Sequence, residues 1–285
     1  MRTEIKTAFL KKIPFVLLIY VFGSIFCRYY QLEHELLYDG SLVEGAFMHR
    51  TLLILTVTFL LGFGITTYCL KKLRTHRACF SSHPLPIILQ AAAAAALICG
   101  NVMQLLSGRE PASVYTMVSV ALVGVLPYLG IASGICILAF ALLVKDGKKP
   151  SPLLYMLTSV YLVVRLIVCF QEWNTDPSIH DYAYELLAAI CCMLGCFQIS
   201  GFGFDKGKRR IATFWCLCAV FFCSISIADL LGNTSELFIN AGLLLLMLTH
   251  GLQLLYANED IEEELPQSPA AEGAATEEAT KLPEE

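Results

Sequence analysis

The sequence predicts an all-α integral membrane protein, a bundle of about eight transmembrane helices with both termini in the cytoplasm. Hydrophobic residues make up 56% of the 285 residues and charged residues only 15%, which is outside the usual balance of soluble domains. The charges cluster between apolar runs that approach the roughly 20 residues a helix needs to cross about 30 Å of hydrocarbon. A third observation, the placement of Lys and Arg, predicts the orientation.

Eight apolar runs carry this prediction. In chain order they cover residues 13–30, 51–70, 84–106, 114–144, 153–170, 182–204, 211–231 and 237–256. The first run follows the basic start MRTEIKTAFLKK, as the core of a secretion signal would. The sequence after it, GSIFCRYY, offers no small-residue cleavage site, so we expect an uncleaved helix. Residues 1–256 are therefore predicted to form one transmembrane domain.

Lys and Arg alternate between the two sides of the predicted membrane. Sixteen of the 20 basic residues fall on the side of the N-terminus, whereas the loops of the other side hold only Arg28, Arg50 and Arg109. Cytoplasmic loops of membrane proteins are enriched in Lys and Arg. Both termini are therefore predicted to be cytoplasmic, and the remaining basic residue, Arg165, lies inside the fifth helix.

The third and fourth runs contain small residues at helix-packing spacing. The stretch QAAAAAALICG surrounds the third helix with small side chains, and LGIASGIC places Gly130 and Gly134 four residues apart in the fourth. Small residues at this spacing let helix backbones approach closely in lipid. We expect contacts within the chain, with a dimer face as the alternative. Pro127 is expected to kink the fourth helix.

Polar side chains gather in the outer half of the predicted bundle. Arg165 lies about 18 Å along the fifth helix from the cytoplasm, and Glu185 lies roughly 5 Å below the outer border in the sixth, so the two can meet. Tyr161 and Glu172 share the stripe of Arg165 at spacings of four and seven residues. The predicted ligand-binding site consists of Arg165, Glu185, Asp229, Tyr161, Asn101, Gln104, Asn240 and Glu172.

Three roles for Arg165 stay open at this point. An unpaired charge in lipid costs at least a few kcal/mol, so the guanidinium either reaches the outer headgroups as an anchor, forms a buried ion pair, or lines a polar pocket. The ion pair would join Arg165 to Glu185 or Asp229 and fix helix register. In an outward-open pocket, Arg165 would contact an anion, and Glu185 or Asp229 would bind a cation or a proton.

No residue pattern indicates an enzyme. Ser133 lacks the glycine that rhomboid-type hydrolysis needs two residues earlier, because that position is Ile131. The six histidines are spread over both sides of the membrane, with only His250 inside it, which argues against a metal centre. We expect no catalytic residue, no metal, no cofactor and no nucleic-acid partner.

The 12 cysteines lie mostly inside the predicted helices, and none lies in the predicted outer loops. A disulfide framework is therefore not expected. The cluster ICCMLGC (Cys191, Cys192 and Cys196) has no neighbouring His or carboxylate, which favours small packing residues over the alternative of a metal or redox site.

Residues 257–285 form an acidic tail with ten acidic residues, one lysine and three prolines. This composition predicts a disordered cytoplasmic segment. It leaves two hypotheses for function. The first is a small transporter or ligand-binding membrane protein with its site in the outer half. The second is a structural or sensory membrane protein whose tail docks a cytoplasmic protein partner.

Two stretches carry a family resemblance: WNTDPSIHDY at residues 173–182 and GFGFDKGKRR at 201–210. Together they resemble uncharacterised multi-pass membrane proteins of clostridial-type bacteria. The resemblance implies a location in a bacterial plasma membrane. It implies no chemistry and assigns no functional residue.

Overall fold

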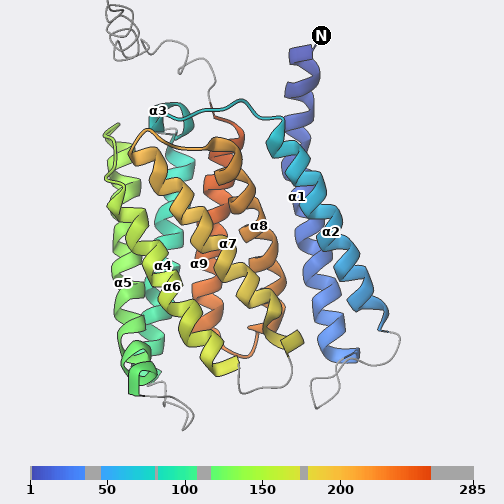
Figure 1. Cartoon of the computed structure of the whole chain (residues 1–285), viewed down its shortest axis with the longest axis vertical. Coiled ribbons are helices and arrows are strands. Elements are labelled where there is room, and N and C mark those ends of the chain that lie inside the picture. The colour runs from blue at the N-terminus through green and yellow to red at the C-terminus, as the bar shows by residue number, and fades with distance from the viewer. Residues whose placement is uncertain (1, 36–45, 81–82, 108–116, 174–178, 258–285) are drawn as a thin grey trace, which may run out of the picture.

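The computed structural model describes residues 2–35, 46–80, 83–107, 117–173 and 179–257. Within these ranges the chain forms nine α-helices and no strand (Figure 1). Their bounds are α1 Arg2–His34, α2 Phe47–Tyr68, α3 His76–Cys79, α4 Pro84–Ser107, α5 Met117–Lys145, α6 Leu153–Trp173, α7 Ile179–Gly203, α8 Arg209–Asp229 and α9 Thr234–Leu255.

All of these helices except the short α3 are long and apolar enough to cross a membrane. They coincide with the eight predicted runs, so the predicted fold class, an all-α polytopic helix bundle, is confirmed. Their apolar outer surfaces contact the lipid bilayer. Several boundaries differ from the prediction, and two of these differences bear on the predicted site. Helix α1 continues past residue 30 to His34, and α9 begins at Thr234 rather than at residue 237.

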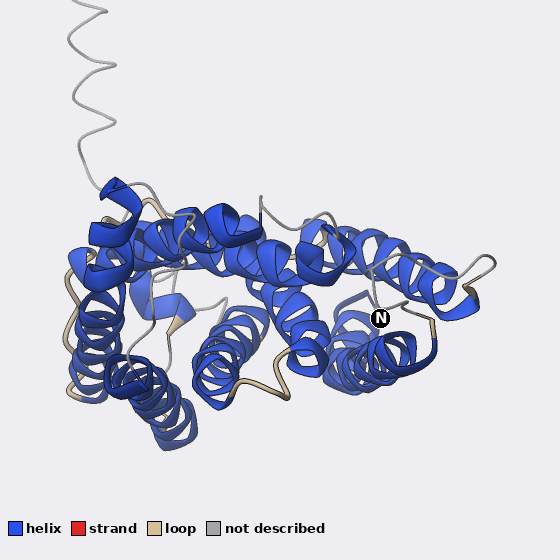
Figure 2. Ribbon diagram, turned by 90° about the horizontal axis from the view of Figure 1, so that it is seen from below, coloured by secondary structure: helices blue, strands red, loops and turns tan. Residues whose placement is uncertain are grey.

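The bundle is elongated, with α1 and α2 on one flank and α5 on the other (Figures 1 and 2). Helix α8 packs against α1, α2, α7 and α9, and it is the most buried of the spanning helices. In the other part, α4 lies between α5 and α9, and α6 lies between α5 and α7. The helices that supply the predicted site residues therefore pack side by side.

The start of α1 and the end of α9 lie at the same end of the bundle (Figure 1). We call this the basic end, because it carries the clusters at residues 71–77, 145–149 and 206–210. Arg209 stabilises it by donating to the last carbonyls of α9, with 2.7 Å from Nε to the Leu254 oxygen and 3.0 Å from Nη2 to the Leu255 oxygen. The cytoplasmic tail prediction falls on residues 258–285, outside the described residues.

The small residues of the third and fourth runs make contacts within the chain, as expected. A Cβ atom at Gly100 of α4 would lie 2.8 Å from the Ser235 carbonyl oxygen, and one at Gly242 of α9 would lie 2.9 Å from the Ala93 carbonyl oxygen. At Gly134 of α5 it would lie 2.5 Å from Ile98. Helices α4, α5 and α9 are therefore held at a distance that only glycine permits at these positions.

The cysteine cluster of ICCMLGC lies in the interior of α7. Cys191, Cys192 and Cys196 are all buried, and the Cys192 sulfur is 3.5 Å from the Cys223 sulfur of α8. Thiols placed this way fill the α7–α8 interface as small side chains.

Candidate functional site

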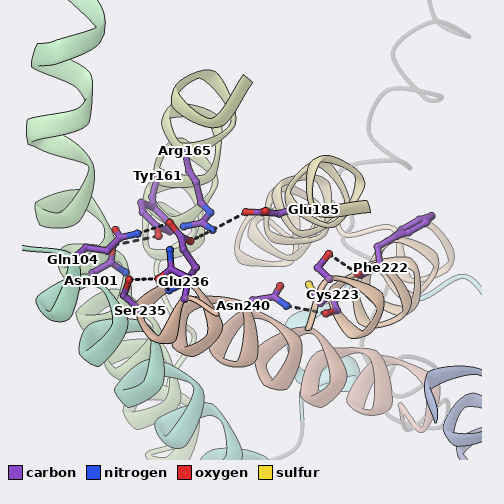
Figure 3. A network of polar contacts seen from close by, with 12 residues as sticks. Asn101, Gln104, Tyr161, Arg165, Glu185, Phe222, Cys223, Ser235, Glu236 and Asn240 are labelled. Carbon is purple, nitrogen blue, oxygen red and sulfur yellow. Dashed lines mark hydrogen bonds and ion pairs between the residues drawn. The ribbon is translucent and has the colours of Figure 1, made fainter. Parts of the chain in front are cut away.

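The centre of the candidate site is Arg165 of α6, which is buried inside the bundle at 4% exposure. Its Nη2 nitrogen donates to carboxylates of two other helices: Oε2 of Glu236 in α9, and Oε1 of Glu185 in α7 at 3.4 Å (Figure 3). The predicted contact with Glu185 is therefore present. Of the three roles considered for Arg165, headgroup anchoring is contradicted, because the side chain is enclosed by helices and paired.

Glu236 is the strongest partner of Arg165, and sequence analysis missed it. It lies in the first turn of α9, where the Asn233 side chain caps the helix by accepting from the Glu236 backbone N–H at 3.3 Å. The spacing of Asn233 and Glu236 is that of a capping box, and it was the available signal for an earlier helix start. Ending the outer loop at residue 236 left this carboxylate outside the predicted helix.

Three predicted residues complete the network around the ion pairs. Gln104 of α4 donates from Nε2 to Oε1 of Glu236 at 2.6 Å, which fixes the carboxylate that faces Arg165. Tyr161, one turn before Arg165, donates to Oδ1 of Asn101 at 3.3 Å. Figure 3 shows these side chains converging from α4, α6, α7 and α9. We call Arg165, Glu185, Glu236, Gln104, Tyr161 and Asn101 the Arg165 network.

Asn101 fits into the network because α5 has a glycine opposite it. A Cβ atom at Gly130 would lie 2.0 Å from Oδ1 of Asn101. The amide nitrogen of Asn101 donates to the Leu97 carbonyl oxygen at 2.7 Å, so its oxygen is left facing Tyr161. The small-residue surface of α5 thus also makes room for a polar side chain.

Of the other three predicted residues, Asp229 and Asn240 do not join the network. Asp229 pairs with Arg28 of α1 instead of with Arg165, at 2.8 Å from Oδ1 to Nε, so the alternative Arg165–Asp229 pair was wrong. Asn240 donates to the Cys223 carbonyl oxygen of α8 at 2.8 Å. The Glu172 side chain lies outside the described residues, so its prediction is not tested.

Arg28 was assigned to an outer loop, and the structure places it inside the bundle with no exposed surface. Its Nη1 donates to Gln31 at 3.1 Å, and its guanidinium carbon lies 5.3 Å from the centre of the Tyr184 ring. Gln31 in turn contacts His49 of α2 at 3.3 Å. The spacing of Arg28, Gln31 and Glu35 along one helix face was the available signal that α1 continues.

One atom of the Arg165 network bears on function. The Nη1 nitrogen of Arg165 is buried and has no hydrogen-bond partner. Buried donors are almost always paired, so this guanidinium nitrogen inside a membrane span retains the capacity to donate a hydrogen bond to an acceptor group. The described residues contain no group of three or more His, Cys, Asp or Glu arranged to hold a metal ion.

Comparison of the chain with known protein families, with curated proteins and with solved structures finds no match. The resemblance to membrane proteins of clostridial-type bacteria therefore stays a prediction.

Proposed function

We propose that this multi-pass membrane protein is a small transporter or ligand-binding protein of a bacterial plasma membrane, and that its ligand is a small zwitterion bound at the Arg165 network. The unpaired Nη1 of Arg165 carries this proposal. An ion pair that served only to fix helix register would be expected to satisfy its buried donors, since each one left unpaired costs about 1–3 kcal/mol.

The two carboxylates differ in how firmly they hold Arg165. Glu236 accepts from both Arg165 and Gln104 and its side chain is 7% exposed, whereas the contact of Glu185 with Arg165 is longer, at 3.4 Å, and the Glu185 side chain is 16% exposed. Glu185 is therefore the partner that an entering ligand displaces more easily. A ligand that replaces it needs an anionic or carbonyl group for Arg165 and a cationic group for the released Glu185. A small amino acid has both.

The side from which the ligand enters follows from the charge distribution. The Arg165 network lies in the half of the bundle away from the basic end, near the starts of α7 and α9. The positive-inside rule assigns the basic end to the cytoplasm. The proposed site therefore faces the outside of the cell.

Thermal unfolding of the purified protein tests this proposal. Glycine, alanine and glutamine are the zwitterionic probes, and acetate and ethylammonium carry the separate charges. We expect at least one zwitterion, and neither single ion, to raise the melting temperature of the wild type. Glu185→Gln should lose this stabilisation. Asp229→Asn, which breaks the other ion pair between helices, is the matched control and should keep it.

Two outcomes would reject the ligand site. Either no zwitterion stabilises the wild type, or Glu185→Gln responds as the wild type does. In both cases the Arg165 network would be a structural connection between four helices, in line with the second hypothesis of a structural or sensory protein.

A further inference from the structure

A cavity of about 930 Å³ opens at the basic end, at the opposite end of the bundle from the Arg165 network. Its lining residues belong to α3, the first turns of α4 and the last turns of α5 and α9. Figure 1 shows these elements together at the basic end. Much of its wall is apolar and includes Phe80, Leu85, Leu89, Val144 and Leu252. Its volume is within the range of about 300–1,000 Å³ that is typical of small-molecule sites.

Two buried polar side chains line this cavity with unpaired atoms. His76 of α3 is 8% exposed and Gln253 of α9 is 9% exposed, and the Nε2 nitrogen of each has no hydrogen-bond partner. Polar atoms this deeply buried are normally satisfied. Two residues with such atoms in the lining of one cavity favour a site for a polar ligand group.

Hydrogen bonds among buried side chains fix the orientation of Gln253. Its Oε1 oxygen accepts from Nε2 of Gln90 at 3.1 Å and from Nδ1 of His250 at 3.2 Å. Because His250 therefore carries its proton on Nδ1, its Nε2 accepts from the hydroxyl of Tyr155. With its oxygen occupied, Gln253 has only its N–H donors left for the cavity, so the ligand must supply an acceptor.

The charges around the cavity favour an anion. Arg77 and Lys148 line it and are exposed at its rim, and none of the described lining residues is acidic. Burial and the nearby Lys149 lower the pKa of His76 to about 4, with Asp205 acting in the opposite direction. At neutral pH His76 thus contributes a hydrogen bond and no charge. The positive charge comes from the two rim residues, of which Lys148 also lies 3.9 Å from the carboxylate of Asp146.

We propose that this cavity binds an anionic phospholipid of the leaflet at the basic end. Its phosphate lies between Arg77 and Lys148, where Gln253 and His76 donate to its oxygens, and its acyl chains leave along the apolar wall. Leu85, in the first turn of α4, is 63% exposed and begins the path of these chains into the bilayer. A free phosphate ion shares the headgroup chemistry but makes no use of this wall. The site is independent of the proposed zwitterion site.

Lipid titration of the full-length protein in neutral detergent tests this site. The probes are phosphatidylglycerol, phosphatidylcholine with the same acyl chains, and inorganic phosphate, with the melting temperature as readout. We expect phosphatidylglycerol to stabilise the wild type, phosphatidylcholine to have little effect, and phosphate alone to give only a fraction of the shift. The double variant Arg77→Ala/Lys148→Ala, at exposed positions, should need roughly tenfold more phosphatidylglycerol for the half-maximal shift.

Lys206→Ala/Lys208→Ala is the matched control, because it removes the same charge from the basic end at positions outside the cavity. It should respond like the wild type. Phosphatidylglycerol should raise the melting temperature of Gln253→Leu, measured against that variant without lipid, by less than it raises that of the wild type. Three results would overturn the proposal. The two phospholipids could stabilise the wild type equally, or both double variants could lose the response to phosphatidylglycerol equally. Inorganic phosphate alone could also give the full shift in melting temperature. The last result would assign the cavity to a free anion instead.

Discussion

Two buried arginines, Arg165 and Arg28, are paired with carboxylates from other helices. Arg165 meets Glu236 and Glu185, and Arg28 meets Asp229. A charge in hydrocarbon is costly, and pairing offsets part of that cost when the partners are well placed. The pairs therefore fix which helices lie next to each other, and Arg165 has in addition a buried nitrogen that no residue satisfies.

Glu236 and Glu185 should contribute unequally to stability. Replacing Glu236 with Gln leaves Arg165 without its most buried partner, and we expect a loss of roughly 3–5 kcal/mol in the free energy of unfolding. Glu185→Gln removes a longer and more exposed contact and should cost about 1 kcal/mol or less. Reversible unfolding in mixed micelles measures both values. Equal losses would show that the two carboxylates share Arg165 evenly.

His76 should make stability depend on pH. Its folded-state pKa of about 4 is below the ordinary value of 6.5, so the unfolded chain takes up a proton first as the pH falls. Its contribution is complete above pH 6.5 and is lost between pH 6.5 and 4, by about 3 kcal/mol in total. The His76→Gln variant should lose less stability than the wild type over this interval. Identical pH curves for the two proteins would contradict this assignment.

The estimate of depth along each helix predicted part of the Arg165 network but not Glu236, the main carboxylate partner of Arg165. The rise per residue placed Arg165 and Glu185 at one level, and the structure pairs them. It also placed Asp229 near that level, but level alone does not say which helix faces which, and Asp229 lies against α1 instead. Glu236 was missed because the predicted start of its helix was three residues too late. That error left its carboxylate in the outer loop instead of in the membrane-spanning helix.

At the scale of elements, small residues decide which helices touch most closely. Gly100 of α4 lies against the start of α9, and Gly242 of α9 lies against the middle of α4, so each helix has a glycine where it approaches the other closely. Gly130 and Gly134 of α5 likewise lie where α5 approaches α4 closely. The runs of small residues predicted these close contacts, but their partners required the three-dimensional arrangement.

Replacing two glycines with alanine should distinguish the effect of a close helix contact on stability from the effect of intrinsic helix propensity. Gly100→Ala places a Cβ atom 2.8 Å from a carbonyl oxygen and 2.9 Å from a backbone nitrogen of α9, and we expect a loss of about 1–3 kcal/mol. Gly62→Ala in α2 is the control, because a Cβ atom there meets nothing within 4 Å and alanine favours a helix by up to about 1 kcal/mol. Melting temperatures should move in opposite directions, and a parallel shift would contradict the close α4–α9 contact.

At the scale of the whole molecule, eight crossings return the chain to the end where it began, and Lys and Arg concentrate there. Composition and run length predicted the number of spans, because the bilayer sets helix length almost independently of sequence detail. They did not predict α3, a four-residue helix too short to cross a membrane. Its His76, and Phe80 directly after it, pack against Phe140. Nor did they predict the cavity beside α3.

The predicted orientation can be measured with single cysteine labels. Cys69 and Cys99, the exposed cysteines among the described residues, would first be replaced. Lys208→Cys at the basic end should then react with a membrane-impermeant thiol reagent only from the cytoplasmic side, and Gly232→Cys at the other end only from outside. Reaction of both from one side would refute the alternation of the spans.

The most direct measurement for the proposed function is saturation binding of a radiolabelled zwitterion, the best stabiliser among glycine, alanine and glutamine, to the purified protein. We predict saturable binding that Glu185→Gln or Arg165→Gln abolishes and Asp229→Asn preserves. Absence of saturable binding, or binding that is indifferent to Glu185 and Arg165, would contradict the assignment of the Arg165 network as a ligand site.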